Sequence, residues 1–439
     1  MIAFFLVVVL GLLALVHWYV WRRMVRDVTA PGGLARRIGT GAVIALPVLS
    51  VAALVSGRAG VPFAVQQAVA WPGFLWLATL LYLVLALVVG EAVRPLLTRW
   101  LARRAAGAGA AVPAAAESPA RTGAAAPVPA PAPVPVPERL PEPAPAPAPE
   151  PAPAPEPQSA PVGGVSRRLF VSRVVGGAAA AVAAGTVANG AYGVLRGPRV
   201  KRVTVPLAKL PRAAHGYRIA VVSDIHLGPT LGRAHAQRIV DAINATQPDL
   251  IAVVGDLVDG TVENLGPAAE PLAGLRARHG SFFVTGNHEY FSGADAWVDH
   301  VRELGMRPLR NERLEIAAGF DLAGVDDVAG ESEGQGPDFV RALGDRDRSR
   351  AAVLLAHQPV VIDDAVAHGV DLQLSGHTHG GQLWPGNLLA GLANPTVAGL
   401  ERYGDTQLYV SRGAGAWGPP VRVGAPSDIT LVQLASKQA

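Results

Sequence analysis

Three long apolar runs near the N-terminus constrain the fold of this chain more than any other feature. They cover residues 1–20, 38–56 and 71–89, and each has roughly the twenty residues that cross the hydrocarbon core of a bilayer. A cleavable signal peptide is the alternative for the first run, but no basic segment precedes it. None of the runs has a polar face, which a soluble helical bundle would need. The sequence therefore predicts a membrane region, residues 1–104, with three transmembrane helices.

Arginines flank these runs unevenly. The first loop and the segment after the third run hold Arg22, Arg23, Arg26, Arg36, Arg37, Arg94, Arg99, Arg103 and Arg104, whereas the loop between the second and third runs holds only Arg58. The positive-inside rule then places Met1 outside and the end of the third helix inside. We therefore read the net charge of +4 as a membrane signature and expect no nucleic-acid partner.

Residues 105–165 are mostly Ala, Pro and Glu, with almost no large apolar side chains. Such a composition cannot bury a core, so a disordered Pro/Ala-rich linker is predicted. The next segment, 166–198, begins Ser166-Arg167-Arg168, similar to a twin-arginine signal, and continues with a weakly apolar run. A fourth transmembrane helix is predicted there, which would place the following region outside the cytoplasm. Four basic residues after the run argue against that export: Arg196, Arg199, Lys201 and Arg202.

The region from 199 to 439 has a different pattern, in which short apolar segments each end in polar residues. Strands are predicted at 218–223, 250–254, 281–285, 352–356 and 371–374, and a helix at 233–244. The strands run into the motifs D-I-H, G-D, G-N-H-E, a single His and G-H-T-H. Polar residues beyond strand ends mark the sites of open α/β sheets.

The residue types in these motifs predict a metal site. The chain has no cysteine, so a metal must be held by His, Asp, Asn or Glu, which suits Mn²⁺, Fe²⁺/Fe³⁺ or Zn²⁺. If D-x-H lies on an extended segment, Asp224 and His226 point to the same side. His377 and His379 would repeat that geometry. One such pair is weak evidence, but five motifs that each end a strand are strong evidence together.

This set of motifs resembles the calcineurin-like metallophosphoesterase superfamily over residues 199–438. The match runs through 224–226, 255–256, 286–289, His357 and 376–379. The D-I-H-L-G opening, G-H-T-H-G-G-Q and the segment 411–417 resemble the membrane-associated branch that includes YkuE- and YaeI-type phosphodiesterases. The resemblance implies an α/β fold, a four-layer α/β/β/α metallophosphoesterase sandwich with the site at one edge of its sheets.

The resemblance also implies a role for each motif residue. One metal would be held by Asp224, His226, Asp256 and His379, and a second by Asp256, Asn287, His357 and His377. A hydroxide bridging the two ions would attack the phosphorus. His288 would be catalytic, protonating the leaving oxygen or stabilising the transition state. We expect Asp259 and Glu289 to support or cap the site rather than bind metal.

These inferences predict a multi-pass cell-membrane protein with an extracytoplasmic catalytic domain. Its substrates would be phosphodiesters, phosphomonoesters or pyrophosphates, and the membrane location suggests a lipid-linked substrate at the bilayer surface. Two alternatives stay open at this point: a non-catalytic metal-binding scaffold on the same fold, and a nuclease. The sequence leaves the metal identity, the natural substrate and the oligomeric state open.

Overall fold

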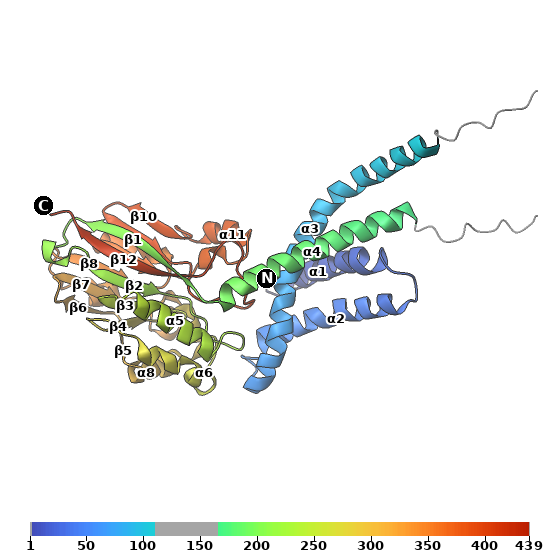
Figure 1. The fold of residues 1–439 in the computed structure, drawn as a ribbon. Coiled ribbons are helices and arrows are strands. Elements are labelled where there is room, and N and C mark those ends of the chain that lie inside the picture. The colour runs from blue at the N-terminus through green and yellow to red at the C-terminus, as the bar shows by residue number, and fades with distance from the viewer. Residues whose placement is uncertain (1, 110–165, 439) are drawn as a thin grey trace, which may run out of the picture.

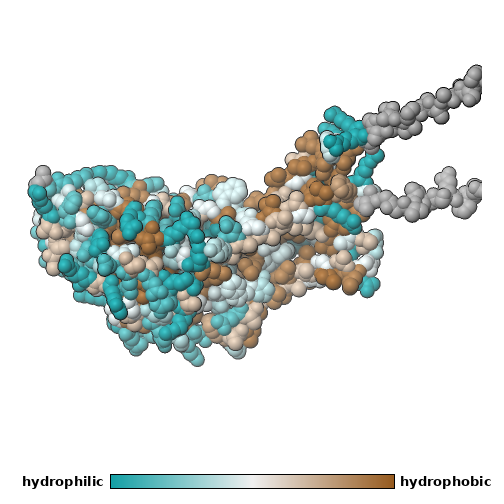
Figure 2. Space-filling model, in the orientation of Figure 1, coloured by the Kyte–Doolittle hydropathy of each residue, from teal (hydrophilic) through white to brown (hydrophobic). Residues whose placement is uncertain are grey.

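The N-terminal region forms four long helices. The computed structural model describes residues 2–109 and 166–438, so most of the expected linker, 110–165, lies outside the described residues. The helices are α1 (Ile2–Trp21), α2 (Leu34–Val55), α3 (Phe63–Gly109) and α4 (Arg167–Leu195), with a π-helical turn at Arg22–Arg26. Each is long and apolar enough to cross a membrane. Figure 2 shows the hydrophobic residues gathered over these helices, whereas the rest of the surface is mainly hydrophilic.

Helix α3 is longer than the apolar run that predicted it. It has 47 residues and continues through 105–109, which we had expected to begin the linker. The apolar run ends near residue 89, but Leu, Arg and Ala dominate the following residues, and these are strong helix formers. The helices also pack on one another. The Ser50 hydroxyl donates to the Gly73 carbonyl at 2.8 Å, and Arg23 pairs with Glu91 at 2.6 Å.

The region after α4 contains two six-stranded sheets (Figure 1). The first has the order β1 (Arg199–Leu207), β12 (Asp428–Ser436), β2 (Arg218–Val222), β3 (Leu250–Val254), β4 (Ser281–Val284), β5 (Met306–Pro308). The second has the order β10 (Gly399–Tyr403), β11 (Thr406–Val410), β9 (Leu372–Ser375), β8 (Ala351–Leu355), β7 (Phe320–Gly324), β6 (Glu312–Ile316). Parallel pairing joins β2–β3–β4–β5 and β7–β8–β9–β11, while β12 runs antiparallel to β2.

The two sheets pack face to face and are covered by helices on their outer faces. Val221 and Val353 belong to the core between the sheets. The next residue along, Val222, lies instead in a second core with helices α5 (Arg233–Ala245), α6 (Val262–Ala269) and α8 (Ala294–Glu303), because successive side chains of a strand point to opposite faces. Leu354 packs in a third core with α9 (Phe339–Leu343) and α10 (Ile362–Ala367). The predicted α/β/β/α sandwich is confirmed.

The strand predictions agree closely with these sheets. Every predicted strand exists, with bounds that differ by no more than one residue at either end. These strands were recognisable because nearly all of their residues are apolar and buried, as expected for parallel strands covered on both faces.

The helical region contacts the sandwich directly. The Tyr82 hydroxyl of α3 donates to the Trp384 carbonyl at 3.0 Å. Gly190 of α4 lies so close to Val421 and Arg422 that an added Cβ would be 2.7 and 2.8 Å from their atoms. Helix α4 leads into β1, and Figure 1 shows its end against the sandwich near α11 (Gly386–Ala393). The membrane helices and the sandwich therefore share an interface as well as a covalent connection.

Candidate metal centre

The predicted site residues come together at one edge of the sandwich. The loops after β2, β3 and β4 bring Asp224, Asp256 and Asn287 from the first sheet. The loops after β8 and β9 bring His357 and His377 from the second. Because these parallel strands end at the same edge, residues more than 150 positions apart in the chain become neighbours.

Four of these residues form a first cluster of donor atoms. Asp224, His226, Asp256 and His379 each offer an atom within 4.8 Å of the others. The Nε2 atoms of His226 and His379 face each other at 3.0 Å. Nε2 of His226 lies 3.6 Å from Oδ2 of Asp256, and Nε2 of His379 lies 3.4 Å from Oδ1 of Asp224. The cluster is almost completely buried.

A second cluster shares Asp256 with the first. Asp256, His357 and His377 offer donor atoms within 4.8 Å of one another. Nε2 of His357 lies 3.1 Å from Oδ2 of Asp256. The Asn287 Oδ1 atom lies 3.0 Å from Nδ1 of His377, which adds an amide oxygen to the set. The arrangement places the Asp256 carboxylate between two groups of donor atoms.

The backbone at the site is unusual. Asp224, His226, Asp256, His377 and His379 all have positive φ, between 48° and 72°. Side chains other than glycine rarely adopt this left-handed conformation, and such strain concentrates at functional sites. The expected extended geometry of D-x-H is therefore wrong, because residues 224–226 lie beyond β2 in left-handed turns. His377 and His379 likewise do not lie side by side but serve different clusters.

Two acidic residues support the clusters from outside. Asp259 Oδ1 accepts a hydrogen bond from Nδ1 of His226 at 2.8 Å, which directs Nε2 of that ring toward the first cluster. Glu289 is fully buried and accepts from the backbone N–H groups of Asp256, Leu257 and Gly286 at 2.6–2.9 Å. Glu289 therefore fixes the loop that carries Asp256. Neither residue belongs to either of the two clusters that share Asp256.

Burial and the neighbouring groups shift the pKa values of the site residues. Burial acts to raise the pKa of Asp256, but the neighbouring His357 and other imidazoles outweigh burial and keep that pKa well below its usual range. Burial together with nearby His357 lowers the pKa of His377 to about 4, so this ring is neutral at pH 7. An ionised carboxylate beside a neutral imidazole is the protonation state in which both groups bind a cation.

The donor set fits a pair of divalent cations. Nε2 of His357 is buried and has no hydrogen-bond partner in the described part of the chain, despite its 3.1 Å separation from Asp256. Buried polar nitrogens normally have partners, so this atom and the facing Nε2 atoms of His226 and His379 are the ones a cation would satisfy. Carboxylate, amide and imidazole donors suit Mn²⁺, iron or Zn²⁺. No thiolate is present to favour softer metals.

His288 lies beside the clusters and partly faces solvent. Its Nδ1 atom is 2.7 Å from Oδ1 of Asp259, the same oxygen that accepts from His226. The ring meets Phe291 and Trp417 edge-on, with centroids 5.5 and 5.7 Å away. Asp259 thus orients both a candidate ligand and the candidate catalytic histidine.

Two contributions to the site were not assigned from the sequence. Gly413 lies directly against Asp224, where an added Cβ would be 2.5 Å from the Asp224 Cβ atom, so segment 411–417 forms the floor of the first cluster. Arg422 is buried and donates to Nδ1 of His379 at 3.0 Å. The segment 411–417 was recognisable as a motif without a role. Arg422, an isolated arginine in a loop, carries no local signal.

A sandwich of two sheets whose edge carries two Asp/His/Asn clusters joined by one carboxylate defines a metallophosphoesterase domain. Residues 217–381 match the model of the calcineurin-like phosphoesterase family. An uncharacterized metallophosphoesterase of Aquifex aeolicus is 36% identical over 243 residues, covering 54% of this chain and 92% of the relative. The chain therefore belongs to the metallophosphoesterase family.

Two further relatives have names that refer to a transmembrane protein or to YkuE. The transmembrane protein with metallophosphoesterase domain of Danio rerio is 40% identical over 255 residues, covering 55% of this chain and 58% of that protein. The uncharacterized metallophosphoesterase YkuE of Bacillus subtilis is 29% identical over 289 residues, covering 62% of this chain and 98% of the relative. The expected resemblance to the YkuE-type branch is confirmed. The chain spans little more than half the length of the Danio rerio relative.

Proposed function

We propose that this chain is a membrane-tethered phosphoesterase that uses two divalent metal ions to hydrolyse phosphodiester, phosphomonoester or pyrophosphate bonds. The observation that carries the proposal is the shared Asp256. Its carboxylate lies 3.6 Å from Nε2 of His226 in one cluster and 3.1 Å from Nε2 of His357 in the other. One carboxylate with ligands on both sides is the arrangement that holds two cations at the short spacing of two-metal hydrolases.

Each cluster would hold one of the two ions. Asp224, His226, Asp256 and His379 would hold one ion, and Asp256, Asn287, His357 and His377 the other. When bound, the two ions polarise the phosphoryl oxygens and make water nucleophilic near neutral pH. The protein contributes rigid placement: Glu289 fixes the Asp256 loop, and Asp259 fixes the ring of His226.

His288 is the residue we assign to proton transfer. Its Nδ1 atom is engaged by Asp259, so Nε2 is the atom left to donate a proton to the leaving oxygen. The side chain is 15% exposed, which leaves it accessible to a substrate that enters from solvent. An imidazole suits this role because it can both accept and donate a proton.

The surroundings of His288 support a lipid-linked substrate. Phe291 and Trp417, which flank its ring, are 62% and 54% exposed. Arg58, from the loop between α2 and α3, lies 5.9 Å above the Phe291 ring, so the site opening adjoins the membrane region. Helix α11 adds three leucines with large exposed fractions: Leu388 at 65%, Leu389 at 71% and Leu392 at 85%. An apolar rim continuous with the membrane helices suits a substrate with acyl or polyprenyl chains.

The catalytic proposal is tested with the full-length chain in detergent, stripped of metal and then supplied with Mn²⁺. Hydrolysis of bis-p-nitrophenyl phosphate and p-nitrophenyl phosphate would be measured, with a short oligonucleotide as a third substrate. Metal-dependent release is expected from the wild type and none from Asp256→Asn. His368→Ala, which changes a half-buried histidine that belongs to no candidate metal cluster, serves as the control. Two bound metals without release from any ester would favour a scaffold, and preferential oligonucleotide cleavage would favour a nuclease.

The lipid-linked substrate needs its own test. A phospholipid substrate in vesicles would be compared with the soluble ester for wild type and for the triple variant Leu388→Ser, Leu389→Ser, Leu392→Ser. We expect the variant to lose hydrolysis of the vesicle substrate and to keep hydrolysis of the soluble ester, because these leucines lie on the surface and touch none of the clusters. An equal effect on both substrates would contradict a lipid-binding rim.

The proposed orientation places the catalytic domain outside the cytoplasm. It is supported by the arginines at the start of α4 and the end of α3, because the contacts with the sandwich lie elsewhere, at Tyr82 within α3 and at Gly190 near the end of α4. Since the chain has no cysteine, one can be introduced as a label. Gln438→Cys should react with a membrane-impermeant maleimide in intact cells, whereas Ala102→Cys should react only after lysis. The reverse labelling pattern would invert the topology.

A further inference from the structure

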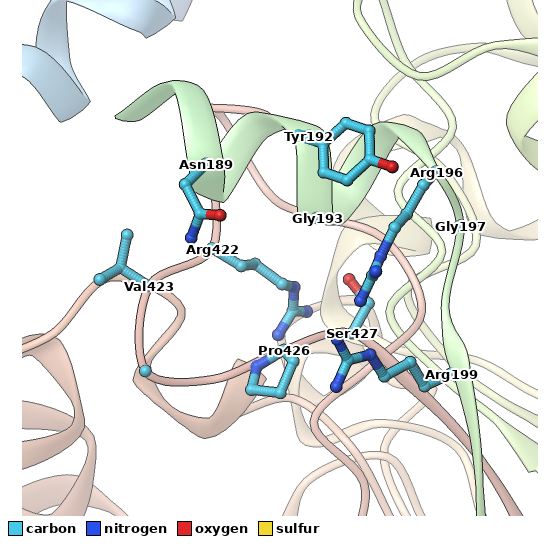
Figure 3. Close-up of a pocket in the computed structure, with 11 residues that line it drawn as sticks. Asn189, Tyr192, Gly193, Arg196, Gly197, Arg199, Arg422, Val423, Pro426 and Ser427 are labelled. Carbon is cyan, nitrogen blue, oxygen red and sulfur yellow. The ribbon is translucent and has the colours of Figure 1, made fainter. Parts of the chain in front are cut away.

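A cavity lies where the last membrane helix meets the catalytic domain. It is formed by the end of α4 and the loop 422–427, and it has a volume of about 270 Å³ (Figure 3). Its charged lining consists of Arg196, Arg199 and Arg422, and Asn189, Tyr192 and Ser427 add polar groups. Figure 3 shows the three guanidinium groups directed toward a common space. None of the residues of the two metal clusters lines this cavity, although Arg422 also contacts His379 of the first cluster.

The lining of this cavity is strongly positive. It contains three arginines and no acidic residue, and no carboxylate of the described chain is ion-paired with any of the three. Unpaired arginines that converge repel one another, which is unfavourable unless an anion joins them. Arginine presents N–H groups in a planar fork that matches the oxygens of phosphate.

Among the three arginines, Arg422 gives the strongest evidence for a bound anion, because it is only 5% exposed. Its hydrogen bonds go to the carbonyl oxygens of Gly415, His379 and Ala425 and to Nδ1 of His379, all uncharged groups. The carboxylates of Asp224 and Asp428 favour its charged form without bonding to it directly, and burial still disfavours that charge. An anion in the adjoining cavity would compensate it.

Ser427 supplies an independent indication of a ligand. The residue is 4% exposed, and its hydroxyl has no hydrogen-bond partner among residues 2–109 and 166–438. Buried hydroxyls are nearly always paired, and an unpaired one calls for a missing acceptor. Since Ser427 lines the same cavity as the arginines, one anionic oxygen would satisfy both kinds of group.

The position of the cavity, just after α4, indicates which anion would bind there. Arg196 directly follows α4, an apolar helix of 29 residues that is long enough to cross a membrane, and Arg199 begins β1. Residues just beyond a transmembrane helix lie at the depth of the lipid headgroups. We propose that this cavity binds a phosphate group, and that its source is the headgroup of an anionic phospholipid. Arg196 and Arg199, two of the four basic residues after α4, then have a local function and argue less strongly against export.

The proposal is tested by lipid binding to the full-length, metal-stripped protein in chelator, so that the metal clusters do not contribute. The protein would be incorporated into nanodiscs of phosphatidylcholine containing a minor share of phosphatidylglycerol, and retained lipids would be measured by native mass spectrometry. We expect wild type to retain phosphatidylglycerol and the double variant Arg196→Gln, Arg199→Gln to retain it at least about tenfold more weakly. The double variant Arg212→Gln, Arg276→Gln removes the same charge from exposed positions outside the cavity and should behave as wild type.

Two further arms make the test specific. Ser427→Val leaves the net charge unchanged and should also weaken retention, which a general surface-charge effect would not explain. Inorganic phosphate added to lipid-free protein in detergent tests the alternative source: binding that depends on Arg196 and Arg199, without preference for phosphatidylglycerol, would assign the site to free phosphate. Equal retention by the pocket and control variants would overturn the proposal. Hydrolysis of a soluble ester should be unchanged by Arg196→Gln, Arg199→Gln, so a failure of the catalytic proposal is distinguishable.

Discussion

Arg422 donates a hydrogen bond to Nδ1 of His379 at 3.0 Å, and this contact fixes the proton on the opposite side of the ring. Arginine has no acceptor, so Nδ1 must offer its lone pair, and a neutral His379 then carries its proton on Nε2. That atom faces Nε2 of His226 at 3.0 Å, while Nδ1 of His226 bonds to Asp259. A continuous chain of hydrogen bonds therefore crosses the first cluster.

A cation bound at Nε2 of His379 must displace that proton. We predict that metal uptake by the wild type releases about one proton more than uptake by Arg422→Met, in which Nδ1 is free to take the proton instead. Calorimetric titration with Mn²⁺ in buffers of different ionisation enthalpy measures the difference. Arg412→Met is the control, because Arg412 is a partly exposed arginine nearby that makes no such contact. Identical proton release by wild type and Arg422→Met would show that the ring binds as an ordinary neutral ligand.

Substitutions of Asp259 and of His288 should differ in their effects on turnover and metal occupancy. His288→Ala should lower turnover by about 10²–10⁴-fold and leave metal occupancy intact, because His288 belongs to neither cluster of candidate ligands that shares Asp256. Asp259→Asn should lower both, since Asp259 contacts His226 as well as His288, and loss of such a supporting contact typically costs about 10–100-fold in metal affinity. Elemental analysis and turnover on a soluble ester separate the two effects. Full activity of His288→Ala would exclude it from leaving-group protonation.

Loss of either cluster should show in metal content as well as in rate. Asp256→Asn weakens both proposed ion sites at once, whereas His377→Ala removes a ligand from the second only. We expect both variants to lose turnover, with metal content close to zero for Asp256→Asn and about one ion retained by His377→Ala. Two ions retained by Asp256→Asn would contradict the shared carboxylate.

Gly376 should tolerate no side chain. A Cβ atom there would lie 1.8 Å from Oγ of Ser223 and 2.4 Å from Oδ2 of Asp224, so the loop between β9 and His377 would have to shift. Gly376→Ala is expected to lower the free energy of unfolding by about 1–3 kcal/mol and to reduce metal occupancy, because Asp224 is displaced. Gly232→Ala, at a glycine with open space around it, is the control and should change stability by less than about 1 kcal/mol. Thermal unfolding and elemental analysis test both variants, and normal metal content in Gly376→Ala would be inconsistent with this packing.

The buried His235 of α5 predicts a loss of stability in acid. Burial and the nearby charges of Arg238 and Arg422 lower its pKa from 6.5 to about 3. Between these values the unfolded chain binds a proton that the folded chain rejects, so stability falls as the pH is lowered, by up to about 1.4 kcal/mol per pH unit. His235→Leu should flatten this dependence relative to wild type when the unfolding temperature is followed in chelator. Parallel curves for the two proteins would show that His235 does not set the acid limit.

The local sequence was sufficient to predict the strands and polar residues at the edge that carries the candidate site. It did not predict the backbone conformation there or the contacts from distant segments. The strands before Asp224, Asp256 and His357 are short apolar runs, so their bounds and the polar residues beyond them were readable. The left-handed turns at Asp224 and His226 were not, since nothing in the pattern separates a strained turn from an extended strand. The position of Arg422 beside His379 depends on packing between distant segments, which leaves no periodic trace in the sequence.

The membrane region shows the same limit. Hydropathy located all four helices, yet it could not reveal that Tyr82 of α3 bonds to Trp384 or that Arg58 lies over Phe291. Such contacts join segments separated by hundreds of residues and follow from the docking of the helices on the sandwich.

The strand order of the first sheet determines when its strands can pair during synthesis. Strand β12 follows every other strand in the chain, yet it lies between β1 and β2, where it pairs with both. The strand that begins just after the last membrane helix therefore has no neighbour until residues 428–436 have left the ribosome. Until then β2, with Asp224 at its end, is an exposed strand edge. A break in the chain before β12 would therefore leave β1 unpaired and one edge of β2 open.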